Sequence, residues 1–135
     1  MLRFSTIAAV AVALLTAACD PNQRGLVAQD KSAVEQYVAS EFSDAPIMVK
    51  VAKCESGLQQ FYPDGSLVRG IRHPPDVGVC QINEAVHSTE ARALGFDLHT
   101  LAGNVKYCRH LFDEEGTQPW ESSRKCWGIY QTASK

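Results

Sequence analysis

Glu55 and Asp76 are the residues of this chain whose types and placement best suit chemistry. Glu55 ends a segment of helical periodicity, directly before Ser56-Gly57, and Asp76 follows 21 positions later. The negative end of a helix dipole disfavours a carboxylate by about 0.3–1 kcal/mol and raises its pKa. If apolar neighbours also remove water from Glu55, its acid form persists near neutral pH, as a general acid requires. The plain alternative is a surface glutamate near a helix end.

Two carboxyl groups in unlike environments can cleave a glycosidic bond. The dry one protonates the leaving oxygen, and the solvated one stabilises or attacks the positively charged sugar carbon. Asp76 follows a segment rich in turn signals. The two side chains are therefore expected to face each other across a cleft between a helix and a small sheet.

The segments that position these carboxylates are mostly helical. Apolar residues recur every three or four positions over residues 34–42, which predicts a first helix that ends near Ser43. A second helix is expected from Asp44, as its N-cap, with Pro46 in the first turn, to a stop at Ser56-Gly57.

The pattern changes after the second helix. Aromatic and β-branched residues surround Pro63-Asp64-Gly65, which predicts a loop with a small hairpin over residues 58–76. Helical signals return in four later segments: 81–85, 89–94, 100–116 and 119–126. Thr100 caps the longest of these, and Pro119 opens the last. The predicted fold class is therefore α+β, mainly helical, with one β excursion.

The first 18 residues predict a signal peptide. Arg3 precedes an unbroken apolar run from Ile7 to Leu15, and small residues follow. The run is much shorter than the roughly 20 residues of a membrane-spanning helix. Residues 15–19 resemble the bacterial lipobox, which implies cleavage before Cys19 and lipidation of its thiol. Plain secretion with cleavage after Ala18 is the alternative.

The rest of the chain is expected to hold one domain. Residues 19–29 are predicted to be the lipidated cysteine and a tether, because apolar periodicity is missing there, and residues 30–135 the folded domain. A chain of 135 residues supports one apolar core. The hydrophobic content of 45% and the net charge of -2 exclude a disordered chain and a polybasic nucleic-acid binder.

Four cysteines remain once Cys19 carries lipid, and exported proteins usually pair their thiols. Two disulfides are therefore expected, in any of three connectivities, among Cys54, Cys80, Cys108 and Cys126. These cysteines contain no C-x-x-C pair, and the four histidines have no ligand spacing, so we expect no metal and no cofactor.

Three motifs resemble the lysozyme-like superfamily. Glu55-Ser56-Gly57 looks like the catalytic E-S-G of soluble lytic transglycosylases. Asp76-Val77-Gly78-Val79-Cys80-Gln81-Ile82-Asn83 looks like the D-x-G-x-x-Q-I-N block of animal-type lysozymes. Gly116-Thr117-Gln118-Pro119-Trp120 resembles the segment whose tryptophan packs against the catalytic glutamate. The motifs occur in the family's order and span about residues 44–127.

The resemblance implies a lysozyme-like fold and peptidoglycan as substrate. It makes Glu55 the acid and Asp76 the second carboxylate. Gln81 and Asn83 would line the sugar cleft. Trp120 would belong to the same substrate-binding set and would remove water from Glu55.

The same resemblance favours one cysteine pairing. Cys54 and Cys126 adjoin the acid and its shielding tryptophan, so a Cys54–Cys126 bridge would fix one to the other. Cys80–Cys108 would then be the second bridge. Each bridge should contribute about 2–4 kcal/mol.

Other aromatic residues have plainer expected roles. Trp127 and Tyr62 are expected to belong to the framework rather than to stack on sugars. The A-Y-N motif that supplies a tyrosine in many lytic transglycosylases has no counterpart here, and the nearest tyrosines are Tyr107 and Tyr130.

The expected activity is cleavage of the MurNAc-β-1,4-GlcNAc bond, of the lytic transglycosylase type, with an anhydro end as product. A hydrolytic muramidase that uses Asp76 as second carboxylate is one alternative. A catalytically inactive lysozyme-fold lipoprotein that binds glycan or another envelope protein is an alternative of another class. The expected partners are peptidoglycan strands and, through the lipid anchor, a membrane, and not nucleic acid. The protein is expected to be an exported monomer at the periplasmic face of the cell envelope.

Overall fold

The computed structural model describes residues 30–130. The signal peptide, the lipidated Cys19 and the tether expected over residues 1–29 lie outside the described residues. Among the helices of residues 30–130, none combines the length and the apolar character needed to cross a bilayer.

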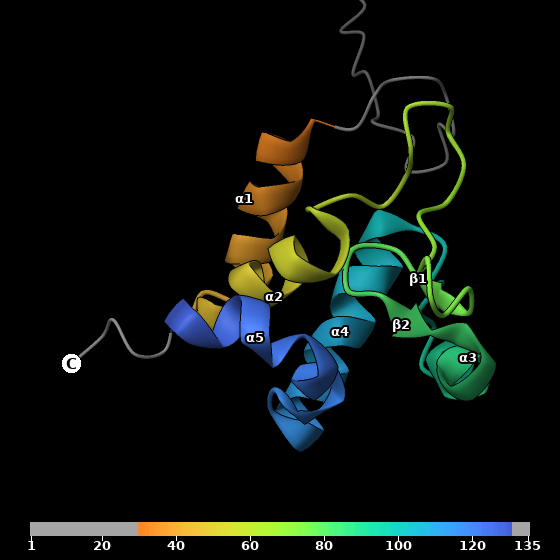
Figure 1. Cartoon of the computed structure of the whole chain (residues 1–135). Helices are drawn as coiled ribbons and strands as arrows, with labels where there is room; N and C mark the ends of the chain where they lie inside the picture. The colour runs from red at the N-terminus through yellow and green to blue at the C-terminus, as the bar shows by residue number, and fades with distance from the viewer. Residues whose placement is uncertain (1–29, 131–135) are drawn as a thin grey trace, which may run out of the picture.

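The described part is mainly helical with one small antiparallel sheet, which confirms the coarse fold class (Figure 1). Its α-helices are α1 (Lys31–Glu41), α2 (Ile47–Ser56), α3 (Glu84–Ala93), α4 (Leu101–Glu115) and α5 (Arg124–Trp127). Its strands are β1 (Asp76–Val77) and β2 (Ile82–Asn83), and two 3₁₀ helices are η1 (Gln118–Ser123) and η2 (Gly128–Tyr130).

Helix α2 lies between α1 and α5 and packs against both (Figure 1). Its buried side chains are Met48, Val49, Val51 and Ala52. The helix ends where Gly57 takes a left-handed conformation, with φ of 64°, and its N–H donates to the carbonyl of Lys53 at 3.0 Å. Glycine adopts this conformation without steric cost, so the predicted stop is confirmed.

The start of α2 corrects a prediction. The helix begins at Ile47, and Asp44 does not cap it. The Asp44 carboxylate instead binds the guanidinium of Arg109 on α4, at 2.5 and 3.0 Å. This ion pair holds the pKa of Asp44 below its usual range. The partner lies 65 positions away, so the local sequence contains no signal for it.

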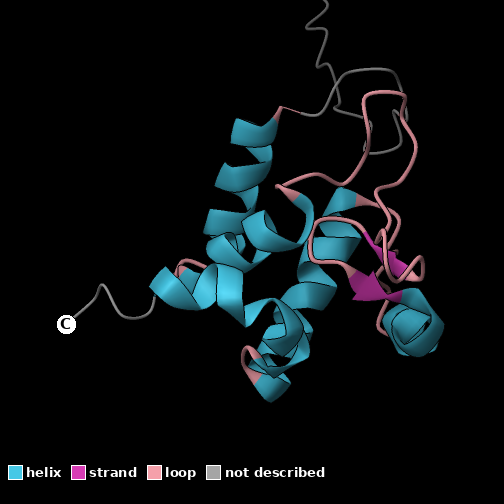
Figure 2. Cartoon of the chain, viewed as in Figure 1, coloured by secondary structure: helices cyan, strands magenta, loops and turns pink. Residues whose placement is uncertain are grey.

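The β excursion also differs in detail. Residues 57–75 form a long loop with two isolated bridges: Phe61 pairs with Leu67 on either side of a turn, and Arg69 pairs with Val77 of β1 (Figure 2). The paired strands come later, with Asp76 opposite Asn83 and Val77 opposite Ile82. The segment predicted as a hairpin therefore holds the turn, and the sheet begins at its last residue.

Two predictions of helix position are wrong. Helix α3 is continuous over Glu84–Ala93, where two separate segments were expected, and residues 82–83 are strand. The last predicted helix is divided into η1, which carries Trp120, and α5, which carries Cys126.

Two buried amides hold the turn between β1 and β2. The Asn104 side chain donates to the carbonyl of Val77 at 3.0 Å, and the Gln60 side-chain oxygen accepts from the N–H of Val79 at 3.0 Å. Between them lies Gly78, with φ of 73°, so close to both amides that a Cβ has no room. The turn that follows Asp76 is thus fixed from two sides.

Two disulfides tie these segments to the helices. Cys54 of α2 is bridged to Cys126 of α5, with Cα atoms 6.0 Å apart. Cys80, after β1, is bridged to Cys108 of α4, with Cα atoms 6.2 Å apart. This is the pairing that the resemblance favoured.

Candidate functional site

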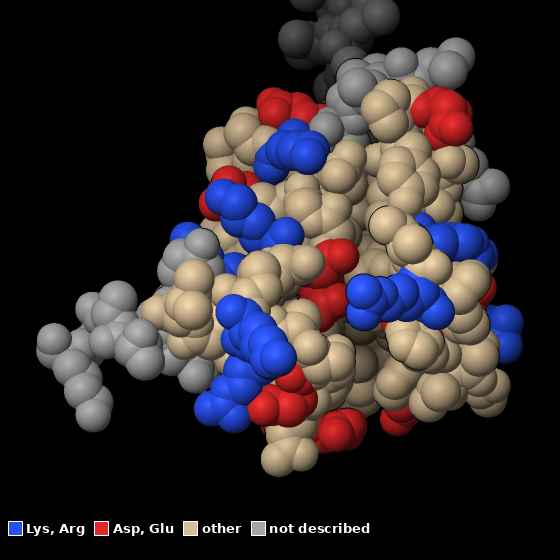
Figure 3. Space-filling view, in the orientation of Figure 1, with Lys and Arg blue, Asp and Glu red and all other residues tan. Residues whose placement is uncertain are grey.

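Glu55 and Asp76 lie in the same groove. Two neighbouring hollows, of about 480 and 220 Å³, share four lining residues: Glu55, Asp76, Gln81 and Ser122. We call the continuous surface of both hollows the carboxylate groove. On the face shown in Figure 3, acidic side chains lie near the centre, with basic side chains on either side.

Glu55 is held where its carboxyl group is half-buried. It stands in the last turn of α2, next to the Cys54 bridge. Burial raises the pKa of Glu55, and the negative charge of Asp76 raises it further. The Ser123 hydroxyl, 2.5 Å from Glu55 Oε1, acts in the opposite direction because it donates a hydrogen bond to the charged form. The net result is a carboxyl group that keeps its proton to higher pH than an ordinary glutamate.

Asp76 enters the groove from β1. Its N–H donates to the carbonyl of His73, and its own carbonyl accepts from the N–H of Gly70, both at 2.9 Å. Within residues 30–130, no group donates a hydrogen bond to its side-chain carboxylate. The backbone is therefore fixed while the side-chain oxygens are left for a ligand or water.

Gln81 and Asn83 both line the groove, as expected. Gln81 lies on both hollows and has a left-handed φ of 51°, which is uncommon for a residue with a side chain. Its side-chain N–H donates to the carbonyl of Gly78 at 2.9 Å. Asn83 lies on the smaller hollow, and its Oδ1 is buried without a donor among the described residues.

Trp120 exposes very little surface to the groove. It lines the smaller hollow together with Glu55, but only 3% of its surface is exposed. Its indole N–H donates to the carbonyl of Cys80 at 2.8 Å. Its expected place beside the acid is thus retained, whereas stacking on a sugar has little surface to use.

The other aromatic residues divide. Trp127 is buried, as expected of a framework residue. Tyr62 is 40% exposed and lines the larger hollow, so its assignment to the framework was wrong. Tyr107 is fully buried, its hydroxyl donates to Glu90, and it does not line the groove. It therefore does not supply the tyrosine that the A-Y-N motif provides.

Basic residues of the long loop form one wall of the groove. Arg69, Arg72 and His73 all line the larger hollow. Arg69 binds Glu84 at the start of α3 at 2.6 Å, and the other carboxylate oxygen of Glu84 contacts His99 at 2.6 Å. This wall is thereby connected to α3 and to the loop before α4.

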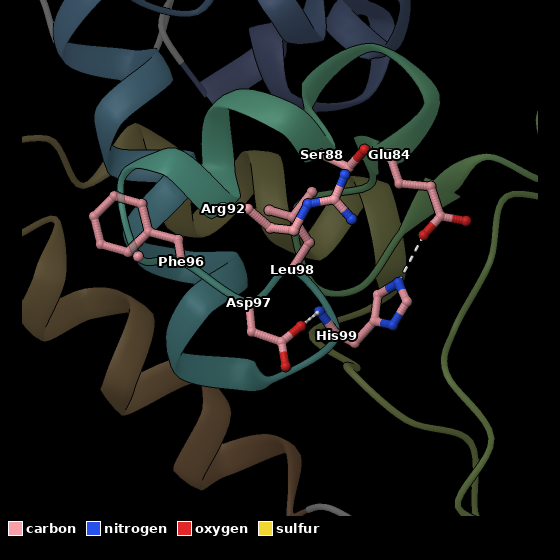
Figure 4. Close-up of a pocket in the computed structure, with 8 residues that line it drawn as sticks. Glu84, Ser88, Arg92, Phe96, Asp97, Leu98 and His99 are labelled. Atoms are coloured by element: carbon pink, nitrogen blue, oxygen red, sulfur yellow. Dashed lines mark hydrogen bonds and ion pairs between the residues drawn. The ribbon is translucent and has the colours of Figure 1, made fainter.

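A separate pocket of about 350 Å³ lies beside α3, and it shares no lining residue with the carboxylate groove. In Figure 4, the dashed contact between Glu84 and His99 spans this pocket's edge, with Arg92 and Asp97 nearby. That contact joins α3 to the loop before α4.

One set of side chains in residues 30–130 has a geometry that suits a metal ion. Glu90, His110 and Glu114 place one ligand atom each within 4.8 Å of one another. The set lies on α3 and α4, and none of the three lines the carboxylate groove.

Sequence reasoning missed Ser123, whose hydroxyl contacts the Glu55 carboxyl group. It lies three positions after Trp120 and three before Cys126, at the boundary between η1 and α5. The sequence holds only a weak signal for this contact: Ser123 lies one helical turn after Trp120.

Comparisons of the chain with protein-family models, with curated proteins and with solved structures give no match.

Proposed function

We propose that this protein is a peptidoglycan glycosidase of the lytic transglycosylase type, built on a lysozyme-like domain. The observation that carries the proposal is Glu55, a half-buried carboxyl group with a raised pKa, in a groove that also contains the carboxylate of Asp76. A carboxyl group with a raised pKa beside a second carboxylate is the pair of groups that cuts a glycosidic bond.

The reaction uses Glu55 twice. Its carboxyl group gives a proton to the glycosidic oxygen, the bond from that oxygen to the MurNAc C1 breaks, and GlcNAc leaves with a hydroxyl group. Asp76 stabilises the positive charge that develops at C1. The Glu55 carboxylate then takes the proton of the MurNAc 6-hydroxyl as that oxygen bonds to C1. The products are an anhydro end and a regenerated acid.

Hydrolysis is the second candidate, and the position of Asp76 favours it. Asp76 lines both hollows with Glu55, and no described group occupies its carboxylate oxygens. In this reaction Glu55 protonates the leaving oxygen as its bond to C1 breaks, and Asp76 bonds to C1 or stabilises its charge. Water then gives a proton to Glu55 as its oxygen bonds to C1, which releases Asp76. A reducing end is the product.

The groove wall suits a sugar polymer with acidic side groups. Arg72 and His73 line the same hollow as Tyr62, an exposed aromatic residue on whose ring an apolar sugar face can stack. Asn83 Oδ1, a buried acceptor that lacks a donor among residues 30–130, suits the N–H of an N-acetyl group. Two disulfides support export, and the lipobox-like Cys19 supports attachment to the envelope membrane.

Digestion of purified sacculi tests the proposal. The purified protein should release muropeptides, and mass analysis of their ends separates anhydro from reducing products. Glu55→Gln should lose at least about 100-fold in rate, because the proton donor is gone. Glu121→Gln is the matched control, because Glu121 is exposed and lies outside the groove. Equal release by Glu55→Gln would overturn the assignment, and no release by the wild type would favour an inactive binding module.

A further inference from the structure

The Ser123 hydroxyl lies among three polar groups. Ser123 Oγ is 2.5 Å from Glu55 Oε1, 3.0 Å from the carbonyl oxygen of Trp120 and 2.9 Å from Nε1 of Trp127. A hydroxyl carries one proton and two lone pairs, whereas an indole nitrogen only donates. In this geometry Trp127 donates to one lone pair of Ser123 Oγ, and the single Ser123 proton goes either to Glu55 or to the carbonyl of Trp120.

The choice between these acceptors follows the protonation state of Glu55. When Glu55 is ionised, Ser123 donates to the carboxylate, in a charge-assisted hydrogen bond. When Glu55 carries a proton, that O–H donates to Ser123 Oγ, and Ser123 turns its own proton to the carbonyl of Trp120. Every group has a partner in both states, and no heavy atom has to move.

We propose that Ser123 is a positioning residue for Glu55 that holds its carboxyl group in one place before and after proton transfer. The inference rests on the proposed function, because both candidate reactions make Glu55 give a proton and take one back within each turnover. A hydrogen-bond partner that binds only the carboxylate would not hold the protonated carboxyl group in place before it gives its proton to the substrate.

The surroundings of Ser123 restrict it to this geometry. The indole rings of Trp120 and Trp127 are 3% and 1% exposed, and Trp127 Nε1 also lies 3.1 Å from the carbonyl of Trp120. The disulfide between Cys54 and Cys126 joins the residue before Glu55 to α5. Both ends of the Glu55–Ser123 hydrogen bond are therefore held by a covalent link close by.

One charged side chain, that of Asp76, acts on Glu55. Asp76 faces it from β1 and raises its pKa. The remaining titratable or charged residues that line the carboxylate groove are Tyr62, Arg69, Arg72, His73 and His87. Replacement of Ser123 by alanine leaves all of these in place, so a change in the titration of Glu55 reports on the hydroxyl.

The experiment compares Ser123→Ala, Ser123→Thr and the wild type over a range of pH. Loss of the hydroxyl removes a donor to the charged form, so the pKa of Glu55 should rise and the alkaline limb of the rate profile should move to higher pH. The rate at the optimum should fall about 10- to 100-fold, because the acid is less well held. Ser123→Thr should restore the wild-type limb. Ser43→Ala, at an exposed serine outside the groove, is the control.

A readout without catalysis keeps the inference separate from the proposed function. Titration of the ¹³C-labelled Glu55 carboxyl group by NMR gives its pKa in folded protein, whether or not glycan is cut. An active protein in which Ser123→Ala stays folded and leaves both the Glu55 pKa and the alkaline limb unchanged would overturn the role of Ser123 alone. A protein that cuts no glycan at all overturns the proposed function, and the positioning role with it.

Discussion

The indole N–H of Trp120 donates to the carbonyl oxygen of Cys80 at 2.8 Å, across 40 positions of sequence. Through this bond the C-terminal segment is fastened to the turn that follows Asp76. Both carboxylate-bearing segments thus meet the same tryptophan, one through this hydrogen bond and the other through the smaller hollow that Trp120 shares with Glu55.

Trp120→Phe should lower the free energy of unfolding by about 2–4 kcal/mol. The buried Cys80 carbonyl loses its hydrogen-bond donor, which costs about 1–3 kcal/mol. The smaller phenylalanine ring also leaves a cavity. Urea denaturation measures the change. Tyr62→Phe, at an exposed tyrosine, is the control, and its free energy of unfolding should stay within about 0.5 kcal/mol of the wild type. A Trp120→Phe protein as stable as that control would contradict the role of this bond.

Gly78→Ala should destabilise more than the same change at Gly65. Both glycines have left-handed φ angles, of 73° and 82°, so alanine is strained at each by about 1 kcal/mol. At Gly78 the new Cβ also meets the amides of Gln60 and Asn104, whereas at Gly65 it meets open space. We expect at least about 2 kcal/mol between the two variants, from the clash. Equal melting temperatures would show that the turn accommodates the Cβ without a clash, and would contradict this prediction.

Asp76→Asn should shift the alkaline limb of the rate profile to lower pH, opposite to Ser123→Ala. The negative charge of Asp76 raises the pKa of Glu55, so its removal lets Glu55 lose its proton earlier. The products distinguish the two reactions. A transglycosylase keeps forming anhydro ends at a reduced rate, whereas a hydrolase that bonds through Asp76 loses nearly all release. A limb that stays in place would mean that the two carboxylates do not interact.

Glu55 should make the wild type less stable as the pH rises. Its pKa in the folded protein lies above the ordinary value of 4.5, so the folded state binds the proton more tightly than the unfolded state. The stability this provides is complete below pH 4.5 and is lost as the pH rises through the folded pKa. Glu55→Gln does not titrate, so its stability relative to the wild type should increase as the pH rises above 4.5. Thermal melts of both proteins across this range would measure the gap, and a constant gap would contradict the raised pKa.

The sequence predicted those features that depend on neighbours along the chain. The stop of α2 at Gly57 and the Thr100 cap, whose hydroxyl accepts from the N–H of Gly103 at 3.0 Å, both follow from residues within one turn. The groove residues Gln81 and Asn83 followed from motif order. Each of these signals lies in a short stretch of sequence.

Contacts between distant segments were missed for the opposite reason. Ser123 meets Glu55 across 68 positions, and Arg109 meets Asp44 across 65. Polar residues with such partners look like ordinary surface or capping residues in the sequence. Asn104 was the one case with a readable signal, because an amide three positions after Leu101 and four before Cys108 falls on the apolar face of its helix.

The turn that carries Asp76 into the groove is held by Gln60 and Asn104, whose amides neither gain nor lose protons in the range where proteins remain folded. The charge of Glu55 can therefore change with pH while these two amide contacts, and with them the placement of Asp76, stay the same.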